Sequence, residues 1–378
     1  MLLASFADVA ELADAQGSGP CGRKVVEVRF LSSAVFKFIM PQSENKKSIH
    51  TLTEQDRRLM ALLDDLPLVA KPWDALATET TSTETAVLHK LKTWSDAGYF
   101  RYFRALFNSE KIGFKSTLSA IATPDDQADS LAAVISESPF VSHNFLRTGA
   151  QFNLWFTLTC PVKGPTLEET IDTLRRNLNV VIRRFDTIRY FKISFKTLFQ
   201  DGHKPSWLEQ PPPTIDLPDD ILIQTISLLQ NDLPLIERPF LSLAKKGNLT
   251  EDQLLEAARL LKHRKILRRL GTIWNLHAIH ETQNVMCAWD APAEQLEPFG
   301  RHAANNPRIS HCYQRVNYPD WPWKIYTVIH GKDRQDCLSL IDQIGAGFPD
   351  VRHIKLWTAK EYKQLPVTFD PAKIVIER

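Results

Sequence analysis

The chain contains a large internal repeat, which constrains its fold more than any other feature of the sequence. Asn231–Ala244 (NDLPLIERPFLSLA) aligns with Asp64–Ala77 (DDLPLVAKPWDALA), and Leu267–Asn275 aligns with Phe100–Asn108, at a constant offset of 167 residues. Solenoid repeats are only about 20–50 residues long, so a repeat of this size is a duplicated domain unit. The sequence therefore predicts two fused copies of one unit that pack as a covalent pseudo-dimer.

Each copy opens with a pattern of three short helices. In the first copy, Thr53 with Asp56 three residues later resembles a capping box before an apolar helical run. Pro72 is placed to start a second helix, and Gly98 to end a third. The strand-like run Tyr99–Phe107 follows. Three helices and a strand predict a winged helix-turn-helix.

The pattern that follows alternates with the period of strands. In the first copy it predicts, in order, strand 116–122, helix 125–136, strand 140–146, strand 152–159, helix 167–178 and strand 187–195. This βαββαβ order is typical of a ferredoxin-like domain. The expected fold class is thus α+β, with a winged helix-turn-helix and a ferredoxin-like domain in each of two tandem copies.

The predicted boundaries follow from these patterns. The first copy spans 51–104 (winged helix) and 105–200 (ferredoxin-like), and the second spans 218–269 and 270–378. Residues 201–217 contain three consecutive prolines and are expected to form a stiff linker. Residues 1–50 are expected to be a disordered or spurious extension, with Met40 as the alternative start.

Composition and cysteine spacing exclude several classes of protein. The net charge of +2 gives no global sign of nucleic-acid binding. The five cysteines are scattered and include no C-x-x-C pair, which argues for a reducing compartment and against a thiolate metal site. No apolar run approaches the ~20 residues that span a bilayer. We expect a cytoplasmic protein with no membrane contact and no metal site of its own.

Candidate functional residues gather in one hairpin of each copy. Ile309–Gly331 (ISHCYQRVNYPDWPWKIYTVIHG) reads as strand, aromatic loop and strand, and Pro139–Leu158 repeats it with a shorter loop. Three pairs of residues correspond: His143 and His311, Phe145 and Tyr313, and Arg147 and Arg315. Because strand side chains alternate, each set of three should share one strand face. We expect His330 at the rim of the site and His353 exposed.

The third helix of the second copy is the candidate DNA-recognition helix. It opens with Glu251 and Asp252 and adds Glu256, while its basic residues come at its C-terminal end. A recognition helix meets DNA with its N-terminal residues, where these acids would repel phosphate. We therefore expect no sequence-specific DNA binding.

The order of domains resembles the Lrp/AsnC regulators, and the local motifs resemble the siroheme decarboxylases. These motifs are FNSEKIGFKSTL (107–118), SHNFLR with FNLWFTLT in the first hairpin, FKISF (191–195), VMCAWDAP (285–292) and the second hairpin. Both copies in one chain resembles the fused form seen in denitrifiers. One position departs from the family: Leu276 stands where a histidine is usual, with His277 and His280 nearby.

The resemblance implies removal of carbon dioxide from two ring acetates of siroheme, giving didecarboxysiroheme for d1-type haem or for an alternative haem route. It implies catalytic roles for His311, His143 and Tyr313. The implied substrate-binding residues are Arg315, Arg147, Trp321, Trp323, Lys324, Tyr318, Trp155 and His277. His311 would either deliver a proton or ligate the iron, and the second hairpin would form the principal site because it carries more polar groups.

The resemblance further implies no cofactor beyond the iron carried by siroheme. Siroheme is the expected small-molecule partner, with self-association through the ferredoxin-like domains and companion decarboxylase subunits as further expected partners. Two alternatives remain open: a ligand-responsive Lrp/AsnC-like transcriptional regulator, and a tetrapyrrole-binding protein without turnover.

Overall fold

We describe the fold from a computed structural model, for residues 52–193, 205, 207, 217–275 and 283–377. The first copy contains α1 (Glu54–Leu62), α2 (Pro72–Glu79), α3 (Glu84–Asp96), β1 (Phe100–Phe107), β2 (Phe114–Ile121), α4 (Asp125–Glu137), β3 (Val141–Thr148), β4 (Leu154–Pro161), α5 (Leu167–Leu178), β5 (Arg183–Phe185) and β6 (Thr187–Ile193). The second contains α6 (Asp219–Leu229), α7 (Pro239–Lys246), α8 (Glu251–His263), β7 (Leu267–Trp274), β8 (Gln283–Asp290), α9 (Leu296–Asn305), β9 (Ile309–Arg315), β10 (Ile325–Gly331), α10 (Arg334–Gly345) and β11 (Arg352–Gln364). The predicted fold class and element order are confirmed.

Local signals explain where the helices begin and end. Thr53 and Asp56 form the predicted capping box of α1, and Pro72 occupies the first turn of α2. Gly98 follows α3 with a φ of +72°, a backbone conformation that costs glycine least. Thr250 and Gln253 build a second capping box at α8.

The two ferredoxin-like domains share one sheet, in the strand order β5-β2-β4-β3-β11-β8-β10-β9-β6. The two outermost strands, β5 and β6, are separated in the chain only by Asp186, so the sheet closes on itself. The copies exchange strands: β6 of the first pairs with β9, and the end of β11 pairs with β3. This pairing satisfies edge strands that each copy alone would leave open.

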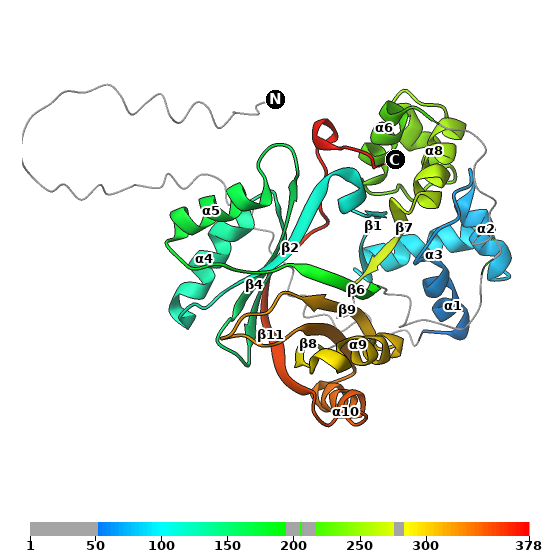
Figure 1. The fold of residues 1–378 in the computed structure, drawn as a ribbon. Coiled ribbons are helices and arrows are strands. Elements are labelled where there is room, and N and C mark those ends of the chain that lie inside the picture. The colour runs from blue at the N-terminus through cyan, green and yellow to red at the C-terminus, as the bar shows by residue number, and fades with distance from the viewer. Residues whose placement is uncertain (1–51, 194–204, 206, 208–216, 276–282, 378) are drawn as a thin grey trace, which may run out of the picture. The chain divides into compact units, whose positions relative to one another are not determined.

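The two faces of this sheet carry different hydrophobic clusters. On the outer face, α4 and α5 pack on strands of the first copy, and a corresponding cluster joins α9 and α10 to strands of the second (Figure 1). The inner face holds a cluster to which both copies contribute, including Trp155, Phe185, Trp321, Tyr326 and Leu356. The inner face is therefore the place where equivalent residues of the two copies come together.

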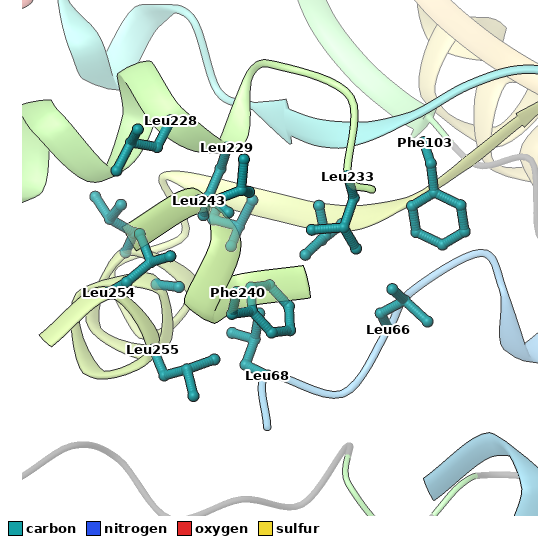
Figure 2. Close-up of a cluster of buried hydrophobic side chains, with 14 of the residues drawn as sticks. Leu66, Leu68, Phe103, Leu228, Leu229, Leu233, Phe240, Leu243, Leu254 and Leu255 are labelled. Carbon is teal, nitrogen blue, oxygen red and sulfur yellow. The ribbon is translucent and has the colours of Figure 1, made fainter. Parts of the chain in front are cut away.

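The two winged-helix domains pack on each other and share one hydrophobic core. The wing strands β1 and β7 pair with each other in an antiparallel ribbon between the copies (Figure 1). Leu66 N–H donates to the Leu270 carbonyl at 2.7 Å, and the equivalent Leu233 N–H donates to the Phe103 carbonyl at 2.8 Å. Figure 2 shows side chains of both copies, such as Leu68 and Leu254, in one buried cluster.

The charged side chains of helix α8 bind partners within the chain. Glu251 is only 7% exposed and pairs with Arg238, so it is not the free repulsive charge that the sequence suggested. Lys262 binds Asp65 of the first copy at 2.5 Å, and Arg259 donates to the Leu68 carbonyl at 2.7 Å. Asp252 remains exposed. Acidic repulsion is therefore a weaker obstacle to DNA binding than the sequence suggested. The stronger obstacle is that Arg259 and Lys262 of α8 already bind groups of the first copy.

We predict no sequence-specific DNA binding at physiological salt, because phosphate contacts need cations that are free to reach the backbone. A gel-shift assay against a random-sequence pool with excess competitor DNA checks this. A complex that resists competitor would contradict the prediction.

A close approach between the copies gives a stability prediction. A Cβ added to Gly271 of β7 would lie 2.2 Å from the Asp64 carbonyl oxygen and 2.5 Å from that of Leu63. Because both contacts are backbone atoms, we expect Gly271→Ala to destabilise the fold by about 1–3 kcal/mol. Thermal melting measures this, with Gly347→Ala as the matched control because nothing lies within 4 Å of its added Cβ. Equal melting temperatures for the two variants would contradict the packing of β7 on the first copy.

Candidate functional site

The first hairpin places its three candidate residues in a stack on the inner face. Phe145 pairs with Trp155 across β3 and β4, and Trp155 belongs to the inner cluster. The rings of His143 and Phe145 lie 6.1 Å apart, and the Arg147 guanidinium lies 5.1 Å from the Phe145 ring. The predicted common strand face is confirmed for this copy.

The second hairpin repeats the arrangement with a tyrosine in the middle. Tyr313 pairs with Tyr326 across β9 and β10, and its ring lies 5.7 Å from that of His311. The Arg315 guanidinium lies 4.8 Å from the Tyr313 ring and 5.8 Å from the Tyr326 ring. Both copies therefore present histidine, aromatic ring and arginine in the same order on the inner face.

Both arginines bind backbone and hydroxyl oxygens of the other copy. Arg147 donates to the Leu356 carbonyl at 3.2 Å and to Thr358 Oγ1 at 3.0 Å. Arg315 donates to the Phe185 carbonyl at 2.8 Å and to Thr187 Oγ1 at 3.0 Å. Strand β11 supplies the two oxygens that Arg147 binds, and Phe185 at the end of β5 with Thr187 at the start of β6 supplies those that Arg315 binds, so the copies depend on each other for the orientation of the two guanidinium groups.

Within the described residues, neither arginine has a carboxylate within ion-pair distance, and the Nε of each is buried without a hydrogen-bond partner. Burial lowers the pKa of Arg147 to about 10 and also lowers the pKa of Arg315. Both guanidinium groups still carry their charge at neutral pH. A buried cation without an anion is unfavourable, so these groups are suited to receive the carboxylate of a ligand.

The histidines are held through Nδ1 by the serine that precedes each. Ser142 Oγ lies 2.8 Å from His143 Nδ1, and Ser310 Oγ lies 2.8 Å from His311 Nδ1. Burial lowers the pKa of His143 to about 4 and that of His311 to about 3. The neighbouring His330 and Arg315 lower the pKa of His311 further, because each disfavours a second positive charge beside it. Both rings are therefore neutral at pH 7.

Two other histidines differ from their expected environments. His330, expected at the rim, is 7% exposed, and its Nε2 lies 2.7 Å from Ser310 Oγ, because it faces inward from β10 beside His311. His353, expected to be exposed, is half-buried with its ring centroid 4.9 Å from that of Trp289. His277 lies outside the described residues.

Comparisons with known proteins agree with the two-copy fold. A family model described as an AsnC-like ligand binding domain matches residues 111–192 and 281–363, and one described as a siroheme decarboxylase NirDL-like HTH domain matches 223–268. The crystal structure of the siroheme decarboxylase NirDL is 27% identical, covers 85% of this chain and 96% of its own, and superposes with a TM-score of 0.64.

Curated relatives agree. The siroheme decarboxylase of Hydrogenobacter thermophilus is 28% identical over 84% of this chain and 95% of its own length. The siroheme decarboxylase beta subunit of Desulfovibrio desulfuricans is 33% identical over 91% of its own length. The chain belongs to the siroheme decarboxylase family. That beta subunit matches 38% of this chain.

Two of the three candidate substrate-binding tryptophans of this family member lie in the core. Trp155 and Trp321 are 1% and 2% exposed, and their ring N–H groups donate to the Phe152 carbonyl and to the Tyr326 hydroxyl. Trp323 packs against the same cluster. The faces of these rings pack within the hydrophobic cluster that the two copies share. We therefore expect the rings to support the site and not to contact the ligand directly.

Two polar residues of the second loop are also engaged. Tyr318 donates its hydroxyl to the Arg184 carbonyl at 2.6 Å, and its backbone bridges to Trp321. Lys324 binds Asp290 at 2.7 Å and donates to the Ala291 carbonyl at 3.0 Å. These contacts tie the loop to β5 of the first copy and to the end of β8.

Sequence reasoning missed Tyr190 on β6 of the first copy. Its ring lies 5.5 Å from that of Tyr313, its hydroxyl donates to Glu110 at 3.1 Å, and Arg268 lies 5.9 Å from its ring. Only the strand exchange brings Tyr190 beside the second hairpin, and no local pattern signals that exchange.

None of the helices in the described segments is long and apolar enough to cross a membrane. Among the same residues no group of three or more His, Cys, Asp or Glu side chains is arranged to hold a metal ion.

Proposed function

We propose that this chain removes carbon dioxide from two ring acetate side chains of siroheme, as a carboxy-lyase of the cytoplasm. The observation that carries the proposal is the pair of arginines, Arg147 (buried) and Arg315 (half-buried), each of which has a buried Nε without a hydrogen-bond partner and no carboxylate partner among the described residues. Siroheme bears many carboxylates, and guanidinium groups grip carboxylates through two parallel hydrogen bonds. Family membership and the NirDL complex with an iron-uroporphyrin III analogue, 26% identical with a TM-score of 0.63, support the same substrate class.

The inner face suits loss of carbon dioxide. A carboxylate moved from water to a poorly solvated site is raised in energy, and its charge disappears in the product, so desolvation favours the forward step. As carbon dioxide leaves, the electrons of the broken C–C bond pass to the methylene carbon and the conjugated ring. We assign Arg315 to holding a carboxylate and His311 to delivering a proton to that carbon, with Tyr313 between them.

The second copy is the proposed principal site. Tyr313 offers a hydroxyl where the first copy has Phe145, and Tyr190 and His330 add polar groups beside it. The first copy keeps the same frame with fewer groups that can move a proton. We propose that the chemistry uses no cofactor beyond the iron that siroheme itself carries.

Turnover tests the proposal. The purified chain is incubated anaerobically with siroheme, and the extracted tetrapyrrole is analysed by mass spectrometry. Loss of two carboxyl masses, absent in a heat-denatured control, is the expected result. Recovery of intact siroheme from folded, siroheme-loaded protein would overturn the proposal in favour of a tetrapyrrole-binding protein.

A further inference from the structure

The second copy contains a hydrogen-bonded chain of three side chains that the first copy lacks. Ser310 Oγ lies 2.8 Å from His311 Nδ1 and 2.7 Å from His330 Nε2. In the first hairpin the position of His330 is taken by Thr159, whose hydroxyl lies 2.8 Å from Ser116 Oγ instead. His143 therefore has a serine partner but no second histidine behind it.

A simple general acid is a poor fit to His311. A general acid must hold a proton before it gives one, and an imidazolium at this place is disfavoured because burial and the neighbouring cations lower the pKa to about 3. The ring is neutral, and after giving up its only N–H proton it would be left as an imidazolate. The proton that leaves must be replaced as it leaves.

We propose that His330 and Ser310 form a proton relay to His311, so that His330 is a positioning residue for protonation of the decarboxylated carbon. The inference rests on the proposed function. A serine hydroxyl both donates and accepts, and a neutral imidazole has one donor and one acceptor nitrogen, so the three groups can pass a proton along without any ring becoming a cation.

The transfers balance. The substrate C–C bond breaks, carbon dioxide leaves, and the electron pair on the methylene carbon takes the proton of His311 Nε2. The Ser310 hydroxyl proton moves to His311 Nδ1, the His330 Nε2 proton moves to Ser310, and His330 Nδ1 takes one proton from solvent. The net change is one carboxylate and one solvent proton converted to a methyl group and carbon dioxide.

The outer end of the chain is placed for this role. His330 lies at the end of β10 close to the surface, because Lys332 and Asp333, two and three residues later, are exposed. Its backbone is held on both sides by Arg308, whose carbonyl accepts from the His330 N–H at 3.0 Å and whose Nε donates to the His330 carbonyl at 3.1 Å. Arg308 is itself paired with Asp336. These contacts fix the backbone that carries the ring, whose Nε2 is directed at Ser310.

His330→Gln separates a relay from a structural role. Glutamine keeps a hydrogen bond to Ser310 but has no second ring nitrogen through which a proton can pass. We expect kcat to fall by at least about tenfold, less than the full ~10²–10⁴ of a lost general acid because His311 remains, with KM nearly unchanged. The control is His353→Gln, at a half-buried histidine outside the stacks. A kcat within twofold of wild type would overturn the relay while leaving the decarboxylase function standing.

Two further readouts complete the test. Ser310→Ala should cost about as much as His330→Gln, and the double variant no more than either, because both interrupt one chain. If wild type itself fails to decarboxylate siroheme, the proposed function falls, and histidine ¹⁵N NMR still tests the chain. A working relay gives His311 nitrogen signals averaged between two tautomers in wild type and a single tautomer in Ser310→Ala. One fixed tautomer in both proteins would overturn it.

Discussion

His311→Ala is expected to slow siroheme decarboxylation by ~10²–10⁴ while leaving siroheme affinity nearly intact. The reason is that His311 supplies the proton, whereas Arg315 binds the substrate carboxylate. Arg315 lies four residues later on the same face of the strand. Single-turnover kinetics with siroheme measure the chemical step, and a spectroscopic titration measures affinity separately.

Two comparisons sharpen this experiment. His143→Ala should cost less than His311→Ala, since the first copy lacks the tyrosine hydroxyl and the second histidine. His302→Ala, at an exposed residue on α9, serves as the control and should turn over normally. Should His311 instead ligate the iron, its loss would shift the absorption of bound siroheme. Near-wild-type turnover of folded His311→Ala would exclude both roles.

Arg315→Ala is expected to weaken siroheme binding about ten- to a hundredfold. A hydrogen bond to a charged group contributes roughly 1.5–3 kcal/mol, which corresponds to that range of dissociation constants. Arg315→Lys should restore little of the siroheme affinity. The planar guanidinium can donate to the Phe185 carbonyl, to Thr187 and to a carboxylate at the same time, whereas a compact ammonium cannot. Spectroscopic titration with siroheme measures the effect.

The matched control for this variant is Arg189→Ala on β6. Its side chain is 47% exposed and already paired with Glu297 at 2.9 Å, so it should bind no ligand carboxylate. Thermal melting establishes that both variants are folded, since Arg315 also donates to the exchanged strand. Equal siroheme affinities for Arg315→Ala and Arg189→Ala would contradict the assignment of Arg315.

Local sequence signals predicted the elements of this fold well, because capping and side-chain alternation act over a few residues. The capping box at Thr53 and the shared strand face of His311, Tyr313 and Arg315 are both confirmed. The duplication also predicted correctly that the two sheets would associate.

The sequence did not predict which strands of the two copies pair with each other, because these pairs join residues far apart in the chain. Contacts such as Thr187 with Arg315 depend on how strands of the two copies meet, and nothing near either residue specifies it. The same pairing buries Trp155 and Trp321 in a cluster shared by the copies and brings Tyr190 to Tyr313. The candidate site was therefore located correctly on the hairpins, while its supporting contacts required the closed sheet.

We expect siroheme to bind on the inner face of the closed sheet, against the arginine of the second hairpin. An anaerobic crystal structure of the chain with siroheme tests it most directly. The expected result is a siroheme carboxylate within hydrogen-bonding distance of the Arg315 guanidinium, with His311 on the same side of the macrocycle. Siroheme bound among the winged-helix domains or on the outer, helix-covered face, with Arg147 and Arg315 keeping only their present partners, would contradict it.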